Sequence, residues 1–182
     1  MATLLILLLS LLPQSAEPWT HQLDLEPMLR DAQALQKLTI MYDSPLKQGF
    51  ELLFVRGDGF LIQQRYPGRP MSTTDVPTCK GKIDQVKVKE VISLLVGKHF
   101  WELPEKRFLF IGGEPSHEEF EVHSIFISNG TEKAGRVFGA GTYAGKKESI
   151  PDDFAIIEQH LKELARSTFF DMPCHLAPAV QF

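Results

Sequence analysis

One local pattern occurs twice in this chain, and it limits the possible folds more than any other feature. The pattern is an apolar run, a glycine-containing turn, a second apolar run and a segment with helical spacing. The first copy reads FELLFVR-GDG-FLIQQRY and ends with DQVKVKEVISLLV, and the second reads EFEVHSIFIS-NG-TEKAGRVFG and ends with PDDFAIIEQHLKELA. Because apolar runs around a glycine turn favour hairpins, two hairpins that each precede a helix predict an α+β protein.

Both turns and both helices contain residues suited to those structures. Gly57-Asp58-Gly59 offers the glycines that a tight hairpin needs, and Asn129-Gly130 favours a type I′ turn. Asp84 is a suitable N-cap for the first helix, and the second helix begins near Asp152. Apolar residues follow each start at helical spacing, which gives each helix a single apolar stripe.

We therefore expect an antiparallel sheet of four to six strands with two helices on one face, built from a repeated ββα unit. The opposite face would be solvated or would cover a partner. The strands carry apolar residues on both sides, so Leu53, Val55, Ile125 and Ile127 are alternative core positions to the strand residues listed next. The expected core positions are Leu52, Phe54, Val88, Val91, Ile92, Leu95, Phe120, Val122, Phe126, Phe154, Ile157, Leu161 and Leu164.

The N-terminus has the features of an export signal. Leu4 to Leu12 is almost wholly apolar, but a helix that crosses a bilayer needs roughly 20 such residues. We expect cleavage after Ala16 and a secreted or periplasmic protein, and an uncleaved anchor is the alternative. The expected organisation is a signal peptide (1–16), a lead-in (17–36), a single α+β domain (37–170) and a C-terminal tail (171–182).

The two cysteines, Cys79 and Cys174, favour one disulfide if the chain is exported. Such a bond would close a loop of nearly a hundred residues, which the chain-entropy model values at about 4–5 kcal/mol. It would tie the tail to the loop expected over residues 67–82. The alternative is two unpaired thiols.

Composition limits the partners. The 182 residues carry a formal net charge of −4, which argues against a nucleic-acid-binding protein. No stable membrane span is expected, and an envelope or extracellular protein is the expected partner.

Two glycine-containing motifs resemble known sites. Gly139 to Ala144 match G-x-G-x-x-A, but the next helix begins several residues too late to present its N-terminus to a phosphate. We therefore expect a flexible loop over Gly139–Gly145 and no cofactor. Asn129-Gly130-Thr131 spells an N-glycosylation sequon, although a turn role is sufficient to explain it.

One predicted strand carries a candidate metal site. His117, Glu119, Glu121 and His123 alternate along it, so their side chains share a face. Imidazoles and carboxylates at i and i+2 can bind one metal ion, although all four span about 20 Å and cannot reach it together. The alternative is the solvated face of an antiparallel strand.

The run from Leu38 to Leu95 resembles a family of uncharacterised exported bacterial domains, DUF6438. The shared layout is a first strand (LTIMYD), a loop, and FELLFVRGDGFLIQQRY as strand, turn and strand, followed by a helix and a second hairpin and helix. The resemblance covers about residues 37–168. The family has no established activity, so the resemblance implies fold and export rather than mechanism.

The sequence contains no convincing catalytic set. We expect a non-enzymatic exported binding or envelope-associated module. The alternatives are an enzyme or metal-binding protein that uses the His117–His123 strand, and a structural component of a larger assembly.

Overall fold

A computed structural model describes residues 22–46, 49–66, 76–104, 121–143, 146–168, 170 and 174–178. The predicted signal peptide, residues 1–16, lies outside the described residues, as do His117, Glu119 and Phe120. Within the described part of the chain, an antiparallel sheet is packed against two main helices, so the α+β prediction is confirmed.

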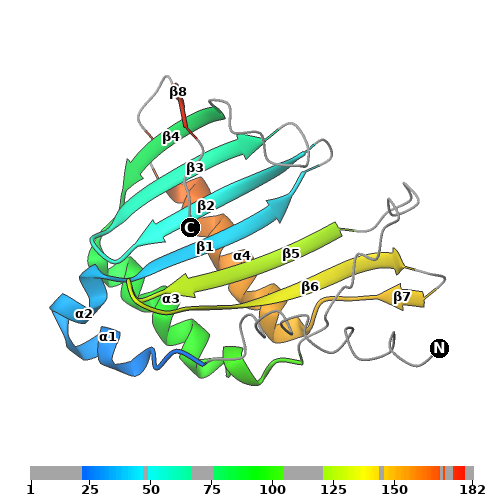
Figure 1. Ribbon diagram of the computed structural model, residues 1–182, viewed down its shortest axis with the longest axis horizontal. Coiled ribbons are helices and arrows are strands. Elements are labelled where there is room, and N and C mark those ends of the chain that lie inside the picture. Colours follow the sequence, from blue (N-terminus) through cyan, green and yellow to red (C-terminus); the bar gives the residue numbers. More distant parts are fainter. Residues whose placement is uncertain are drawn as a thin grey trace, which may run out of the picture.

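The sheet is larger than the four to six strands expected. Seven strands form one continuous antiparallel ladder, and the short β7 pairs with the end of β6, which gives the order β7-β6-β5-β1-β2-β3-β4-β8 (Figure 1). Two of these strands, β4 and β8, lie in segments predicted to be loop and tail. The strands are β1 (Thr39–Pro45), β2 (Phe50–Arg56), β3 (Phe60–Tyr66), β4 (Val76–Lys82), β5 (Glu121–Ser128), β6 (Lys133–Tyr143), β7 (Lys146–Glu148) and β8 (His175–Ala177).

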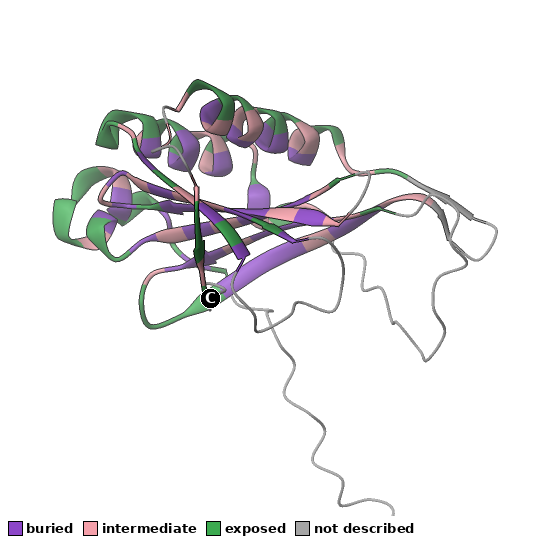
Figure 2. Ribbon diagram, turned by 90° about the horizontal axis from the view of Figure 1, so that it is seen from above, coloured by how far each residue is buried: buried purple, intermediate pink, exposed green. Residues whose placement is uncertain are grey.

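The helices lie where the apolar stripes predict them. Figure 2 shows the long helices on one side of the sheet, which we call the helix face. Asp84 caps α3 by accepting from Val86 N–H, as expected, whereas the residue that precedes α4 is Pro151, without a side-chain cap. The helical elements are α1 (Glu26–Arg30), α2 (Ala32–Gln36), α3 (Gln85–Gly97), the 3₁₀ turn η1 (Phe100–Glu102) and α4 (Asp152–Ser167).

The two hairpin–helix segments have opposite hands. Strands β2 and β5 are both antiparallel to β1, so they are parallel to each other, but they lie on opposite sides of it. The first segment adds β3 and β4 in one direction and the second adds β6 and β7 in the other, while α3 and α4 pack on the same face. Since no rotation superposes units of opposite hand, the structure does not show a repeated ββα unit.

The helix face holds the larger core. All predicted helix residues of this core are buried, and the Phe138 ring of β6 contacts the Phe154 ring of α4 with 4.5 Å between centroids. On β5, however, Ile125 and Ile127 face the helices and are 0% exposed. The prediction that placed Val122 and Phe126 on this side was therefore wrong in phase, because apolar residues occupy both sides of the strand.

The opposite face is buried around β2 and β3, which corrects the expectation of a solvated face there. Leu52 and Phe54, predicted for the helix-side core, belong to this second cluster with Phe50, Tyr66 and Val76. The Phe50 and Tyr66 rings stack at 4.7 Å.

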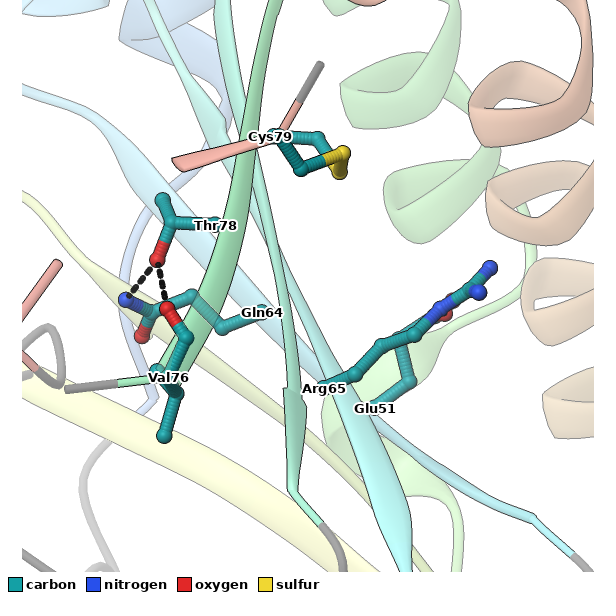
Figure 3. Close-up of a disulfide and its surroundings, with 7 residues drawn as sticks. Glu51, Gln64, Arg65, Val76, Thr78 and Cys79 are labelled. Atoms are coloured by element: carbon teal, nitrogen blue, oxygen red, sulfur yellow. Dashed lines mark hydrogen bonds and ion pairs between the residues drawn. A yellow bond between two sulfur atoms is a disulfide. The ribbon is translucent and has the colours of Figure 1, made fainter. Parts of the chain in front are cut away.

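A polar network accompanies this second cluster. Gln64, which is fully buried, donates to the Thr78 hydroxyl at 2.9 Å (Figure 3). It also accepts from the Tyr66 hydroxyl at 3.0 Å. Around β2 and β3, the opposite face of the sheet is therefore a second interior in which the polar side chains of Gln64, Tyr66 and Thr78 are hydrogen-bonded.

Cys79 and Cys174 form the predicted disulfide, with 4.5 Å between their Cα atoms. Figure 3 shows the Cys79 side chain on the side of β4 opposite to Thr78, as expected for neighbouring strand residues. Strand β8 follows Cys174 directly and pairs with β4 from Val76 to Thr78. The bond thus fixes the last strand to the edge of the sheet.

The turn between β2 and β3 depends on close backbone contact. Gly57 N–H donates to the Leu38 carbonyl at 2.9 Å, and a Cβ at Gly57 would lie 1.5 Å from the carbonyl oxygen of Leu35. Gly59 has a φ of 84°, a conformation that other residues rarely adopt. The connection between α2 and β1 can therefore pack on this turn only if residue 57 has no side chain.

We expect Gly57→Ala to lower the free energy of unfolding by about 2–3 kcal/mol, because the backbone must move away from Leu35. Gly97→Ala is the control, since a Cβ there contacts nothing within 4 Å. Alanine favours the helix, so this variant should be neutral or stabilised by up to about 1 kcal/mol. Urea unfolding followed by circular dichroism measures both, and similar losses in the two variants would contradict the prediction.

Candidate functional site

Three polar residues lie in phase with apolar stripes and meet between the sheet and α4. Tyr42 follows Ile40 on the helix face of β1, and His123 precedes Ile125 on the same face of β5. Glu158 lies among the buried residues of α4. The exposed fractions of Tyr42, His123 and Glu158 are 2%, 5% and 5%, so all three belong to the interior.

The Glu158 carboxylate is the centre of this cluster. Its Oε1 atom accepts from the Tyr42 hydroxyl and from His123 Nδ1, which lies 2.6 Å away. Lys162 Nζ, one helical turn along α4, lies 3.2 Å from the same oxygen. Three donors from three elements therefore hold one buried carboxylate, and we call Tyr42, His123, Glu158 and Lys162 the carboxylate cluster.

The cluster moves two pKa values in opposite directions. Burial alone would raise the pKa of Glu158, but the hydrogen bonds from His123 and Tyr42 and the charges of His123 and Lys162 outweigh it and hold that pKa at about 2. Burial, and then the hydrogen bond to Glu158, raise the pKa of the Tyr42 phenol far above its usual range. Near neutral pH, Glu158 is therefore ionised and Tyr42 is protonated.

His123 is the member of the cluster with a free ring atom. Its Nδ1–H donates to Glu158, which leaves Nε2 buried and without a hydrogen-bond partner. The Oε2 atom of Glu121 lies 3.5 Å from Nε2. A ring oriented in this way by a carboxylate can present Nε2 to a proton or to a metal ion.

The structure places two of the four predicted metal ligands. Glu121 and His123 share the helix face of β5, as the alternation predicted, but His123 is buried, so the solvated-face alternative is wrong for this residue. His117 and Glu119 lie outside the described residues. No group of three or more His, Cys, Asp or Glu residues in the described ranges is arranged to hold a metal, and the four-residue site stays a prediction.

A buried arginine forms a second polar feature on the helix face. Arg136 of β6 is 7% exposed and donates to the carbonyl oxygens of Gly135 and Trp101. Its guanidinium carbon lies 5.5 Å from the centre of the Trp101 ring. Arg136 thereby attaches η1 to the sheet and fixes Trp101 in place.

A surface cleft of about 350 Å³ lies beside Trp101, between the start of the described chain and the end of α3. Its apolar lining includes Leu25, Leu95 and Trp101. Asp24, Glu26 and Glu102 place three carboxylates around the lining, together with His99. The cleft thus combines an apolar surface with an acidic one.

The glycine-rich segment is not the flexible loop expected over Gly139–Gly145. Residues Gly139 to Tyr143 continue β6, where they pair with β5 and then with β7. Gly145 lies outside the described residues.

Sequence reasoning missed Tyr42 and Glu158 as site residues. The available signal was their phase: Glu158 lies four residues after Phe154 and three before Leu161, and Tyr42 lies two after Ile40. A polar residue inside an apolar stripe must find partners, so its presence on several elements indicates a buried cluster.

Comparison with models of known protein families, and with curated proteins, gives no match to this chain. Among the helices that the structure describes, none is both long and apolar enough to span a bilayer.

We expect the charge of Glu158 to stabilise the fold by on the order of 3 kcal/mol, from the lowering of its pKa from 4.5 to about 2. Because the folded-state pKa is lowered, this contribution is complete above about pH 5 and is lost as the pH falls from 4.5 towards 2. The unfolding free energy of the wild type minus that of Glu158→Gln should shrink over that window in urea titrations at a series of pH values.

Glu163→Gln is the control for this experiment, because Glu163 is exposed on the same helix. It should show a small difference from the wild type at every pH. A Glu158→Gln difference that does not depend on pH would contradict the assignment of an ionised, stabilising carboxylate.

Proposed function

We propose that this chain is an exported, non-catalytic binding module. The observation that carries the proposal is the buried cluster in which three donors hold the Glu158 carboxylate, with the pKa of Glu158 lowered and that of Tyr42 raised. A general acid or base works best when its pKa lies near the working pH. The carboxylate cluster instead holds both groups in one protonation state across the neutral range, which suits a fixed structural connection between α4 and the sheet.

Export is supported by two observations. The apolar segment Leu4–Leu12 has the length of a signal-peptide core, and the Cys79–Cys174 disulfide is typical of an oxidising compartment.

The acidic cleft is the proposed binding surface. Its volume of about 350 Å³ is within the range of ligand sites in proteins, roughly 300–1,000 Å³. An apolar lining with three carboxylates favours a ligand that has apolar groups and positive charge. We therefore propose an envelope or extracellular protein as the partner, recognised through a segment of alternating apolar and basic residues.

Fluorescence polarisation with two labelled hexapeptides tests this function. We expect a peptide of alternating leucine and lysine to bind about tenfold more tightly than its leucine–glutamate counterpart, which corresponds to about 1.4 kcal/mol. The double substitution Glu26→Gln and Glu102→Gln should bring the two affinities close together, because it removes two of the three carboxylates of the cleft.

The matched control is Glu90→Gln with Glu163→Gln, which removes the same charge from exposed positions outside the cleft. This control should retain the preference for the basic peptide. Equal binding of both peptides by the wild type would refute the proposed binding surface.

A second candidate function, metal binding on strand β5, is favoured by one observation. His123 Nε2 is buried and makes no hydrogen bond while Nδ1 is held by Glu158, which is the arrangement of a metal-binding histidine with a supporting carboxylate. Glu121, whose Oε2 atom lies 3.5 Å from Nε2, would supply a second ligand.

If this candidate is correct, zinc titration by calorimetry should show one site in the wild type and at least a tenfold weaker one in His123→Ala. His175→Ala is the control, because His175 is exposed on β8. Equal, weak zinc binding by all three proteins would contradict the proposed metal site.

A further inference from the structure

The loop between β5 and β6 contains the only asparagine of the chain, Asn129. Strand pairing ends with Ser128 opposite Lys133, so the loop has four residues, 129–132, rather than the two of the predicted type I′ turn. Among described residues other than glycine, only His99 has a positive φ. The backbone conformation of a type I′ turn therefore does not explain the asparagine at position 129.

The side chain of Asn129 organises this loop through its oxygen. Oδ1 accepts from Thr131 N–H at 3.0 Å, from the Thr131 hydroxyl at 2.9 Å and from Glu132 N–H at 2.8 Å. The amide nitrogen, Nδ2, makes a single long contact of 3.4 Å with the exposed Glu132 carboxylate. The loop thus uses the acceptor of this side chain and hardly uses its donor.

Elsewhere the chain meets the same structural need with aspartate. Asp24, Asp31, Asp58 and Asp84 each accept from the backbone N–H two residues on, at distances of 3.1, 2.8, 3.1 and 2.9 Å. A carboxylate accepts such bonds at least as well as an amide. The local structure therefore explains an oxygen acceptor at position 129, but it does not explain why the residue is asparagine.

We propose that Asn129 is the acceptor of an N-linked oligosaccharide, added as the chain enters a secretory compartment. The inference rests on the export part of the proposed function and adds a modification site. Asn129-Gly130-Thr131 is the acceptor sequence, and Gly130, Thr131 and Glu132 are exposed around it. The threonine hydroxyl that the sequence requires already contacts the asparagine side chain.

The chemistry leaves the loop intact. Nδ2 forms a bond to the anomeric carbon of a lipid-pyrophosphate-linked oligosaccharide, the bond from that carbon to the pyrophosphate oxygen breaks, and Nδ2 loses one proton. The product is still an amide with a carbonyl oxygen. All three hydrogen bonds to Oδ1 can therefore persist in the glycosylated loop, while the sugar extends from the exposed nitrogen.

The test is expression of the full chain, with its own leader, in cultured animal cells. Secreted protein is digested with peptide-N-glycosidase, which converts a glycosylated asparagine to aspartate, and is analysed by intact-mass and peptide-mass spectrometry. We expect the wild type and Thr131→Ser to lose one oligosaccharide and to show aspartate at position 129. Thr131→Ala and Asn129→Asp should carry no oligosaccharide.

Three results would overturn the proposal, and they are distinguishable. Secreted, disulfide-bonded wild type without a sugar would reject the modification and keep export. A chain that stays reduced in the cytosol would reject export and the modification together. An Asn129→Asp variant that fails to fold would show that the fold needs the amide nitrogen. The structure alone would then explain why residue 129 is asparagine.

Discussion

Burial of the Glu158 carboxylate is the constraint on which the helix face depends. An ionised group inside a protein is tolerated only when charge and hydrogen bonds replace the lost water. Here the replacement comes from β1, from β5 and from the same helix, through Tyr42, His123 and Lys162. The position of α4 along the sheet is therefore defined by directional bonds, in addition to the packing of Phe154 and Leu161 that any apolar surface could provide.

The helices could be predicted from the sequence because one side of each is apolar and the other is not. The side of α3 that faces the core is determined by its single apolar stripe, Val88, Val91, Ile92 and Leu95. The strands could not be phased in the same way. In β2, Leu52, Leu53, Phe54 and Val55 are consecutive and all buried, since this strand separates two interiors. Such a run shows that a strand is present without indicating which residues face the helices.

The candidate site was predictable only in part, because its contacts join distant segments. Alternation placed Glu121 and His123 on one face of a strand, but the partner of His123 is 35 residues further along the chain and belongs to a helix. Similarly, β4 and β8 lie in segments predicted to be loop and tail, because residues 67–82 are rich in proline, glycine and threonine and β8 has only three residues. Both exist as strands because each has a neighbour to pair with, which local sequence does not reveal.

The opposite hands of the two hairpin–helix segments bear on how the chain arose. A gene duplication copies the amino-acid order of a unit and with it the hand in which that unit folds. Segments that extend from β1 in opposite directions, with both helices on one face, do not superpose as two copies of one folded unit. Their similar patterns of apolar residues are what any hairpin and helix need in order to cover the same side of one sheet, so common physical requirements are sufficient to explain the internal likeness of this sequence.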